Sequence, residues 1–256
     1  TYANGNIDAG VEFSVVCSPE GYTYVPDDNF EQALIDLGYD DVLNDFVLTE
    51  NISGVTTLDV SVKEISDLTG IEGFTVLQEL NVDYNQLTSL NVNGAASLTG
   101  LWCRGNQLTS LDVSNNTALT YLFCNENQLT SLDVINNTAL INLNCLDNQL
   151  TALDVSNNTA LIYLRCEDNQ LIHLNMKNGV TDQLTAFDAT DNSFDCIEVN
   201  AEDVDYATEN WTSGNGNIDE GVEFSVVCAP EGYTYVPDDN FEQALIDRKS
   251  TRLNSS

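Results

Sequence analysis

Apolar residues recur at fixed positions between Val55 and Val199, and the whole pattern repeats about every 21 residues. Three of its four clearest copies begin at Leu98, Leu119 and Leu140 and read LTGLWCRGNQLTSLDVSNNTA, LTYLFCNENQLTSLDVINNTA and LINLNCLDNQLTALDVSNNTA, and the fourth begins at Leu161. Each contains the core L-x-x-L-x-C-x-x-N-x-L. A period of this length indicates a solenoid, because one repeat cannot bury its apolar face alone and needs its neighbours to cover it.

Less regular copies extend this array in both directions. Further copies begin at Leu77 and Leu184, and a 22-residue variant begins at Val55. We therefore expect about seven units of 21–23 residues over residues 55–199.

The alternation of apolar residues within each copy predicts a short strand. Leu122 and Cys124, for example, are two residues apart and would both point into the core. Strands of successive repeats would stack in parallel, and the Leu-Asp-Val that follows predicts a second extended segment before the Ser-Asn-Asn-Thr turn. The predicted fold class is an α/β solenoid, mostly β: a curved array of short parallel strands with a short N-terminal cap helix and little other helix.

An asparagine recurs where each copy must turn after its strand. A buried amide there can bond backbone groups that the turn leaves unpaired. The column consists of Asn85, Asn106, Asn127, Asn148, Asn169 and Asn192. By contrast, we interpret the Asn-x-Thr sequons at Asn115, Asn136 and Asn157 as turn chemistry and not as glycosylation sites.

A solenoid needs caps over the apolar faces at its ends, and a helix is predicted at the N-terminal side. It follows Pro26 and ends at Gly38. Asp28 and Glu31 have the spacing of a capping box, with Asp in the place of Ser or Thr. The expected apolar face of this helix consists of Phe30, Ala33, Leu34 and Leu37.

A long internal duplication indicates a tandem array of larger modules. Residues 4–36 and 215–247 are identical except at two positions, with a constant offset of 211 residues. We therefore expect a fragment of a longer protein. Its expected parts are the end of a preceding module (1–17), an N-terminal cap with a helix near 28–37 (18–54), the repeats (55–199), a C-terminal cap (200–228) and the start of the next module (229–246).

The final residues depart abruptly from the duplication. Residues 247–256 resemble the translation of a common sequencing adapter, and they carry three of the seven basic residues. We interpret them as an artefact and not as part of the natural protein.

The charge excludes one class of partner. Seven Lys and Arg face 41 Asp and Glu, a formal net charge of −34. A surface this acidic repels phosphates, so nucleic acid is not an expected partner. No apolar run is long enough for a transmembrane helix in this fragment, and the lack of a secretion signal in a fragment is uninformative.

The repeats resemble the internalin family of bacterial leucine-rich-repeat surface proteins. The copy from Val55 is similar to the 22-residue internalin unit, and the copies with Cys in the strand are similar to the cysteine-ladder repeats of internalin J and of Bacteroidetes secreted proteins. The resemblance covers residues 24–228. It implies a secreted or cell-surface protein that binds an extracellular protein or carbohydrate.

The seven cysteines fall into two groups. One group occupies the inner strand position and consists of Cys103, Cys124, Cys145 and Cys166. We expect these to be small buried hydrophobes and not metal ligands. Cys196 and Cys228 stand outside the ladder, and we predict a disulfide between them that closes the C-terminal cap. Cys17, the duplicate of Cys228, would pair within the preceding module, and such pairing favours an extracellular setting.

Residues that flank the inner Leu and Cys would point outward, onto the concave face. They include aromatic and arginine side chains, the usual composition of a binding hot spot, and Tyr and Trp rings also suit stacking on sugars. The expected ligand-binding residues are Trp102, Arg104, Tyr121, Phe123, Tyr163 and Arg165. We expect the four aromatic residues to form one patch. The alternative is that they only stabilise the sheet as cross-strand pairs.

Acidic residues recur in two columns, one beside the Asn turn and one in Leu-Asp-Val. A solvated acidic face explains both columns, and calcium that bridges carboxylates of neighbouring repeats is the more specific alternative. The weak calcium candidates are Glu126, Asp147, Asp168 and Asp191. No other cofactor is expected.

No constellation of catalytic residues stands out from the repeats. His173 is the only histidine, and neither a Ser-His-Asp grouping nor a Gly-rich phosphate loop is present. The chain is therefore expected to be an adhesin-like extracellular binding scaffold and not an enzyme. Two alternatives stay open: a calcium-bridged structural stalk or matrix protein, and the accessory binding region of a secreted polysaccharide-degrading enzyme.

Overall fold

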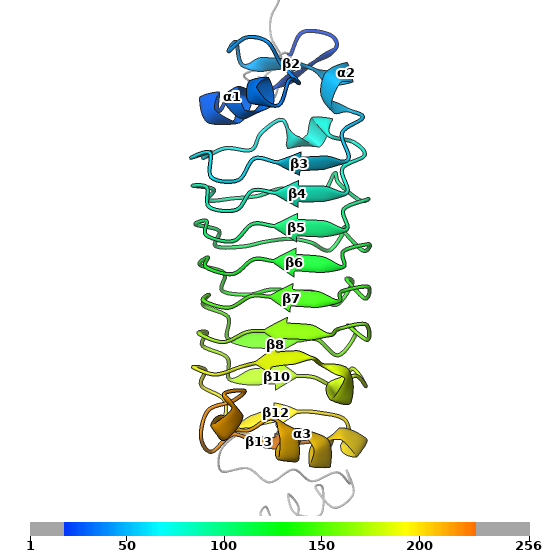
Figure 1. The fold of residues 1–256 in the computed structure, drawn as a ribbon, viewed down its shortest axis with the longest axis vertical. Coiled ribbons are helices and arrows are strands. Elements are labelled where there is room, and N and C mark those ends of the chain that lie inside the picture. Colours follow the sequence, from blue (N-terminus) through cyan, green and yellow to red (C-terminus); the bar gives the residue numbers. More distant parts are fainter. Residues whose placement is uncertain (1–17, 229–256) are drawn as a thin grey trace, which may run out of the picture.

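The turns of the chain stack into a rod with a cap at each end (Figure 1). A computed structural model describes residues 18–228. The expected end of a preceding module (1–17), the start of the next module (229–246) and the adapter-like tail (247–256) lie outside the described residues, and so does Cys17. No helix in the described range is long and apolar enough to cross a membrane.

Seven parallel strands, one from each turn, form a sheet along the rod that we call the long sheet. Its register places equivalent residues side by side, so that Leu80, Leu101 and Leu122 follow one another. In sheet order the strands are β3 (Thr57–Asp59), β4 (Glu79–Asn81), β5 (Gly100–Trp102), β6 (Tyr121–Phe123), β7 (Asn142–Asn144), β9 (Tyr163–Arg165) and β11 (Ala186–Asp188). The predicted parallel solenoid of about seven turns with little helix is confirmed.

The second extended segment of the repeat forms a separate four-stranded sheet, the short sheet. In sheet order its strands are β8 (Ala152–Asp154), β10 (His173–Asn175), β12 (Cys196–Glu198) and β13 (Glu223–Ser225). In earlier turns the same segment contributes only an isolated bridge between Asn91 and Asp112. The repeat therefore pairs fully on this side only toward the C-terminal end.

One apolar core runs through the stacked turns. Leu122 and Cys124 are fully buried, as their spacing predicted. The column of cysteines continues as Val82 in the turn before and as Ala189 in the turn after, both fully buried. The leucines of one turn are covered by those of the adjacent turns, and burial of one leucine side chain contributes about 1.5–3 kcal/mol. Each turn is therefore stabilised mainly by its neighbours.

The recurring asparagine ties each turn to the one before it. Nδ2 of Asn106 donates to the carbonyl oxygens of Val82 and Cys103 at 3.0 and 3.1 Å, and its Oδ1 accepts from the amide of Leu87 at 3.0 Å. Equivalent bonds are made by Asn85, Asn127, Asn148, Asn169 and Asn192. The prediction that this column satisfies the backbone of the turn is confirmed.

The N-terminal cap contains a two-stranded antiparallel sheet and short helices. Its elements are β1 (Tyr22–Tyr24), α1 (Asp28–Asp36), β2 (Phe46–Leu48), α2 (Thr49–Ile52) and the 3-10 helix η1 (Ile71–Gly73) of the first turn. Phe30, Ala33 and Leu34 of α1 are buried and close this end of the core. Gly70 has φ 106°, and a Cβ atom there would lie 2.8 Å from the carbonyl oxygen of Tyr24, so the cap packs directly on backbone.

The predicted N-cap of α1 is wrong by one residue. Asp27, and not Asp28, caps the helix, because its Oδ1 accepts from the amides of Asn29 and Phe30, both at 3.0 Å. Asp28 already lies in the first turn and its side chain is exposed. The sequence offered two adjacent aspartates, and the extended backbone at Asp27 decides between them.

Leu37 was wrongly assigned to the buried face of this helix. Its side chain is 46% exposed. The helix ends at Asp36, and the chain turns at Gly38 with φ 81°, so Leu37 lies beyond the last packed turn.

The C-terminal end is covered by α3 (Val204–Asn210) with the 3-10 helices η2 (Thr181–Gln183), η3 (Ala201–Asp203) and η4 (Ser213–Asn215). Trp211 is buried, and its ring centroid lies 4.3 Å from that of Phe187 on the last strand of the long sheet. A disulfide joins Cys196 to Cys228, with Cα atoms 5.7 Å apart. It ties β12 to the end of the described chain.

Two residues of this cap, Asn217 and Asp219, take the place of a further turn through backbone and side-chain bonds. The carbonyl oxygen of Asn217 accepts from the amide of Ala189 at 2.8 Å, and its Nδ2 donates to a carbonyl oxygen of β11 at 2.8 Å. The carboxylate of Asp219 accepts from the amides of Asp191 and Asn192 at 3.0 and 3.1 Å. The edge of the long sheet is thereby paired where the repeats stop.

Candidate binding surface

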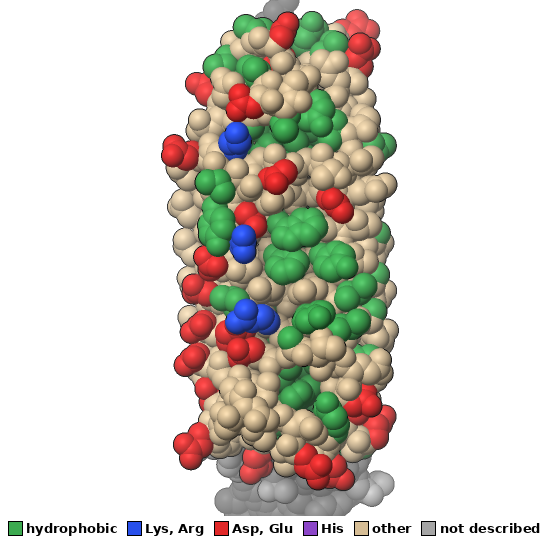
Figure 2. Space-filling view, viewed as in Figure 1, with side chains coloured by type: hydrophobic (Ala, Val, Ile, Leu, Met, Phe, Trp, Pro, Cys, Tyr) green, Lys and Arg blue, Asp and Glu red, His purple; other side chains and the backbone are tan. Residues whose placement is uncertain are grey.

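The residues singled out from the sequence lie on or beside three strands of the long sheet, β5, β6 and β9. Register places the strand residues in two columns. One column contains Gly100, Tyr121, Asn142 and Tyr163, and the other contains Trp102, Phe123, Asn144 and Arg165. Figure 2 shows hydrophobic side chains gathered over the middle of this face, with Lys and Arg side chains beside them.

Three aromatic rings form a platform over β5 and β6. The ring planes of Trp102 and Phe123 differ by 10°, with centroids 6.0 Å apart, and those of Trp102 and Tyr121 differ by 16°, with centroids 6.4 Å apart. A Cβ atom at Gly100 would lie 2.5 Å from Cη2 and Cζ3 of Trp102, so the indole rests directly on the glycine backbone. The parallel rings therefore lie against the sheet and turn their faces outward. We call Trp102, Tyr121 and Phe123 the aromatic platform.

The fourth predicted aromatic residue lies apart from this platform. Tyr163 shares a column with Tyr121, but Asn142 of β7 lies between them. Neighbouring strands are about 4.8 Å apart, so two strand spacings separate the tyrosines. Instead of one patch of four rings, the surface has a platform of three, an interval with half-exposed Asn142 and Asn144, and then Tyr163.

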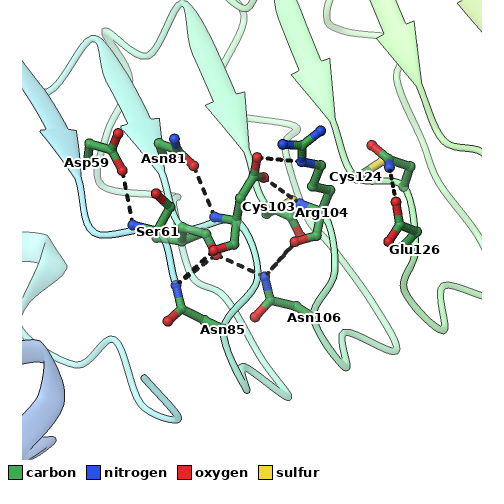
Figure 3. A network of polar contacts seen from close by, with 12 residues as sticks. Asp59, Ser61, Asn81, Asn85, Cys103, Arg104, Asn106, Cys124 and Glu126 are labelled. Atoms are coloured by element: carbon green, nitrogen blue, oxygen red, sulfur yellow. Dashed lines mark hydrogen bonds and ion pairs between the residues drawn. The ribbon is translucent and has the colours of Figure 1, made fainter. Parts of the chain in front are cut away.

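A buried carboxylate holds the side chain of Arg104, two residues after Trp102, and Figure 3 shows Arg104 within the polar network of these turns. Nε of Arg104 lies 2.7 Å from Oδ2 of Asp83, and the Arg104 amide donates to Oδ1 of Asp83 at 2.9 Å. The guanidinium carbon lies 4.8 Å from the ring centroid of Tyr84, a cation–π contact. The Arg104 side chain is 45% exposed and that of Asp83 only 6%, so the guanidinium is anchored from below and reaches solvent.

Arg165 of β9 is held in a similar way. Its Nη2 pairs with Oε1 of Glu167, and the two side chains are 50% and 7% exposed. Burial raises the pKa of the Glu167 carboxyl, and the neighbouring charge of Asp188 adds to this shift. Burial likewise raises the pKa of Asp83, although the hydrogen bond from the backbone amide of Arg104 and the charge of its guanidinium oppose the shift. Both carboxylates are therefore costly to bury, and the arginines offset part of that cost.

The acidic column beside the Asn turn has a conformational explanation. Glu126, Asp147, Asp168 and Asp191 all have positive φ, between 51° and 55°, and their side chains are exposed. Gly105 occupies the same place in an earlier turn, with φ 64°. Left-handed backbone disfavours most residues but is accessible to Gly and to Asp. Turn geometry therefore accounts for most of this column without a metal.

Within the described residues, the potential metal ligands that converge to within 4.8 Å are Asp28, Glu31 and Asp45 of the N-terminal cap. The fully buried carboxylate of Glu31 accepts from the amides of Asn44 and Phe46, at distances of 2.9 to 3.1 Å. These bonds explain its burial, because they fasten the loop before β2 to α1. The four calcium candidates of the acidic column are not in this group, and calcium binding there stays a prediction.

The cysteine ladder is unsuited to nucleophilic chemistry. Burial raises the pKa of the Cys124 thiol to about 12, and it also raises the pKa values of Cys103, Cys145 and Cys166 above the ordinary range. The thiols are free but fully buried, so they stay protonated and out of reach of substrate. His173 is exposed on the short sheet and not on the platform face.

The residues that support this surface could be placed on the outward-facing columns from the sequence, but their supporting roles were not predicted. Asp83 and Arg104 are 21 residues apart, so opposite charges at equivalent positions of neighbouring turns were a usable signal for their pairing. Glu167 follows Arg165 by two residues and therefore lies on the same face. For Gly100 no such signal exists, because its role depends on which way the indole of a neighbouring residue falls.

A second buried asparagine column was also overlooked. In each Asn-Asn-Thr turn the first Asn is exposed and the second is fully buried. Nδ2 of Asn137 donates to the carbonyl oxygens of Val113 and Asn116 at 3.0 and 2.9 Å. The buried members are Asn116, Asn137 and Asn158. The motif is therefore a structural tie as well as a turn.

Three internalin structures from Listeria monocytogenes are similar to this chain. The functional domain of InlJ, which includes a cysteine ladder, has a TM-score of 0.56 and 29% identity over 70% of this chain and 52% of that one. Internalin InlF has a TM-score of 0.58 and 21% identity over 69% and 64%. Internalin C2 has a TM-score of 0.51 and 21% identity over 70% and 92%.

The predicted resemblance to internalin-type leucine-rich repeats with a cysteine ladder is confirmed by the InlJ match and by the four buried cysteines. The likeness to InlF and internalin C2 concerns the fold alone. This chain spans about half of the InlJ domain and 64% of the InlF chain. No family model and no curated protein matches the chain.

Proposed function

We propose that this internalin-like solenoid is a non-catalytic extracellular scaffold that binds a protein or glycan ligand through the outer face of the long sheet. The observation that carries the proposal is the aromatic platform of Trp102, Tyr121 and Phe123. Its three nearly parallel rings lie outside the core, and the Trp102 indole rests on Gly100. Exposed aromatic clusters of this kind usually mark interaction sites.

Sheet stabilisation alone is a weaker explanation for the platform. Residues that the scaffold requires recur in nearly every turn, as the inner leucines and asparagines do. The aromatic residues of the platform do not recur in this way, since positions equivalent to Trp102 and Phe123 carry Asn81 and Asn144, and the position of Tyr121 carries Asn142 in the next strand, with the same register. The rings are therefore dispensable for pairing and are better explained by a ligand.

The remaining features agree with an extracellular, non-catalytic role. The Cys196–Cys228 disulfide suits an oxidising compartment, and the free thiols are sequestered in the core. A rod built from inter-turn hydrogen bonds presents its surface in a fixed arrangement, which lowers the ordering cost of binding.

The test is to replace Trp102 and Phe123 by alanine together and to screen wild-type and variant chains on arrays of extracellular proteins and glycans. We expect ligands of the wild type to bind the variant at least about tenfold more weakly, the usual effect of losing a hot-spot aromatic residue. Circular dichroism and thermal unfolding would show whether the variant keeps its fold.

The matched control is Ile172→Ala, which removes an apolar side chain that is 54% exposed just before β10 of the short sheet. It should bind like the wild type. Unchanged binding by a folded Trp102→Ala/Phe123→Ala variant would place the ligand site elsewhere, and so would an equal loss in the control.

A further inference from the structure

The platform has a basic margin in a chain that otherwise avoids basic residues. Only 7 Lys and Arg stand against 41 Asp and Glu, yet two arginines adjoin the platform face. The lysines of the described part do not adjoin the platform strands: Lys63 pairs with Asp36 at 3.3 Å in the first turn, and Lys177 pairs with Glu198 at 2.6 Å beside the short sheet. Solubility does not explain this placement, because acidic residues already provide it.

Both guanidinium groups keep free donors toward solvent. The ion pair with Asp83 uses Nε of Arg104, and the pair with Glu167 uses Nη2 of Arg165. Each arginine side chain is about half exposed. A guanidinium presents five donors in a planar fork that matches carboxylate and sulfate oxygens, and an anchored fork loses little freedom on binding.

From one strand to the next, the surface between these arginines changes from apolar to polar and back. Along the long sheet a ligand would meet the three rings, then half-exposed Asn142 and Asn144, then Tyr163 with Arg165. Each step is one strand spacing of about 4.8 Å. A sugar polymer has the complementary character, since pyranose rings offer C–H faces to aromatic rings and hydroxyls to amides.

We propose that this face binds an anionic polysaccharide, with sugar rings stacked on Trp102 and Phe123 and with carboxylate or sulfate groups paired to Arg104 and Arg165. The inference rests on the proposed function, because it names the ligand class of the same surface. Charge complementarity favours an anionic polymer over a neutral one, and the acidic remainder of the chain confines such a polymer to this face. The flat, outward-turned rings favour a polysaccharide over an acidic protein.

The experiment measures binding of the full chain to polygalacturonate, to its methyl ester and to dextran sulfate by affinity electrophoresis and calorimetry. At least one anionic polymer should bind, and the uncharged methyl ester should bind about tenfold more weakly than polygalacturonate if carboxylates are the anions recognised. Affinity should fall as sodium chloride is added. The two anionic probes distinguish carboxylate recognition from sulfate recognition.

Matched variants separate the charges from the rings. Arg104→Gln and Arg165→Gln should each weaken anionic binding about tenfold, the size of one charge-assisted contact, and leave binding of the ester unchanged. Trp102→Ala should weaken both. Lys177→Gln removes the same charge beside the short sheet, away from the platform strands, and it should have no effect.

Equal binding of a charged polymer and its uncharged counterpart would overturn the proposal, and so would an equal loss in Lys177→Gln and Arg104→Gln. If no polysaccharide binds while a protein ligand is lost on replacing Trp102 and Phe123, this inference fails and the proposed function stands. If replacing the platform affects no ligand at all, both fail. Should Trp102→Ala not fold, the two arginine variants decide the question.

Discussion

At the scale of single residues, buried asparagine amides join the turns where backbone pairing ends. The column that contains Asn106 could be predicted, because one Asn stands alone at its place in the repeat. The column that contains Asn137 could not, because two asparagines recur together with the same period. Periodicity identifies a position but not which of two adjacent residues turns inward. That choice is made by carbonyl groups one turn away.

The Asn-Asn pair provides an internal control for this role. Replacing Asn137 by alanine removes two buried hydrogen bonds to carbonyl oxygens that each keep one backbone donor, so we expect a loss of about 1–3 kcal/mol in the free energy of unfolding. Replacing the exposed Asn136 should change it by less than about 0.5 kcal/mol. Equilibrium unfolding in urea would measure both, and similar losses would contradict the assignment.

The buried thiols of the cysteine ladder should make the protein less stable at alkaline pH. Burial raises the pKa of Cys124 from 9.0 to about 12 in the folded state, so the unfolded chain loses its proton first. The stability that this protonated thiol contributes is therefore full below about pH 9 and is lost as the pH rises toward 12. We expect the urea midpoint above pH 9 to fall more steeply for the wild type than for Cys124→Val. Valine should fit, because Val82 occupies the same column. If the urea midpoint falls equally steeply with pH in both proteins, the Cys124 thiol does not contribute in this way.

At the scale of elements, local sequence patterns predicted the strands and helix α1, but they did not predict the residues that hold these elements in place. The spacing of apolar residues in the repeat predicted the strands of the long sheet, and Phe30 with Leu34 predicted the buried face of α1. The burial of Glu31 depends on a loop that folds back over the helix, and no local periodicity reports it. The orientation of Trp102 likewise depends on the space above Gly100.

The two acidic residues of the first turn of α1 should differ sharply in importance. Glu31→Ala would remove the acceptor of the Asn44 amide and one of the two side-chain acceptors of the Phe46 amide, which keeps Oδ1 of Asn44, at an expected cost of about 2–3 kcal/mol. Asp28→Ala should have little effect, because that side chain is exposed and does not cap the helix. Hydrogen exchange at the two amides would check this directly. Equal protection in both variants would show that Glu31 does not hold the loop.

At the scale of the whole molecule, the repeat period predicted the stacking but not how it stops. Asn217 and Asp219 complete the last turn from sequence that is not part of the repeat, and nothing in their neighbourhood resembles the column that they finish. Such residues can be recognised only when the edge of the sheet with which they pair is known.

The acidic surface gives a direct test of the calcium alternative. With a net charge of −34, any divalent cation should raise the Tm by screening repulsion. Because left-handed turn geometry explains Asp147 and Asp168, we expect calcium and magnesium to raise it equally. Thermal scans in matched chloride salts would decide. A gain specific to calcium, reversed by a chelator, would instead support carboxylate bridging and the structural stalk.

The stacking direction also determines how the rod would respond to tension. Its strands run across the long axis, so the hydrogen bonds between turns run along it (Figure 1). A pull between the two ends would open those bonds one turn at a time, as in peeling, and would not shear a whole sheet. Each 21-residue turn would release about 70 Å of extended chain. The crosslink between Cys196 and Cys228 keeps the residues between them from extending, so such a tether would lengthen from its repeats while its C-terminal end stayed closed.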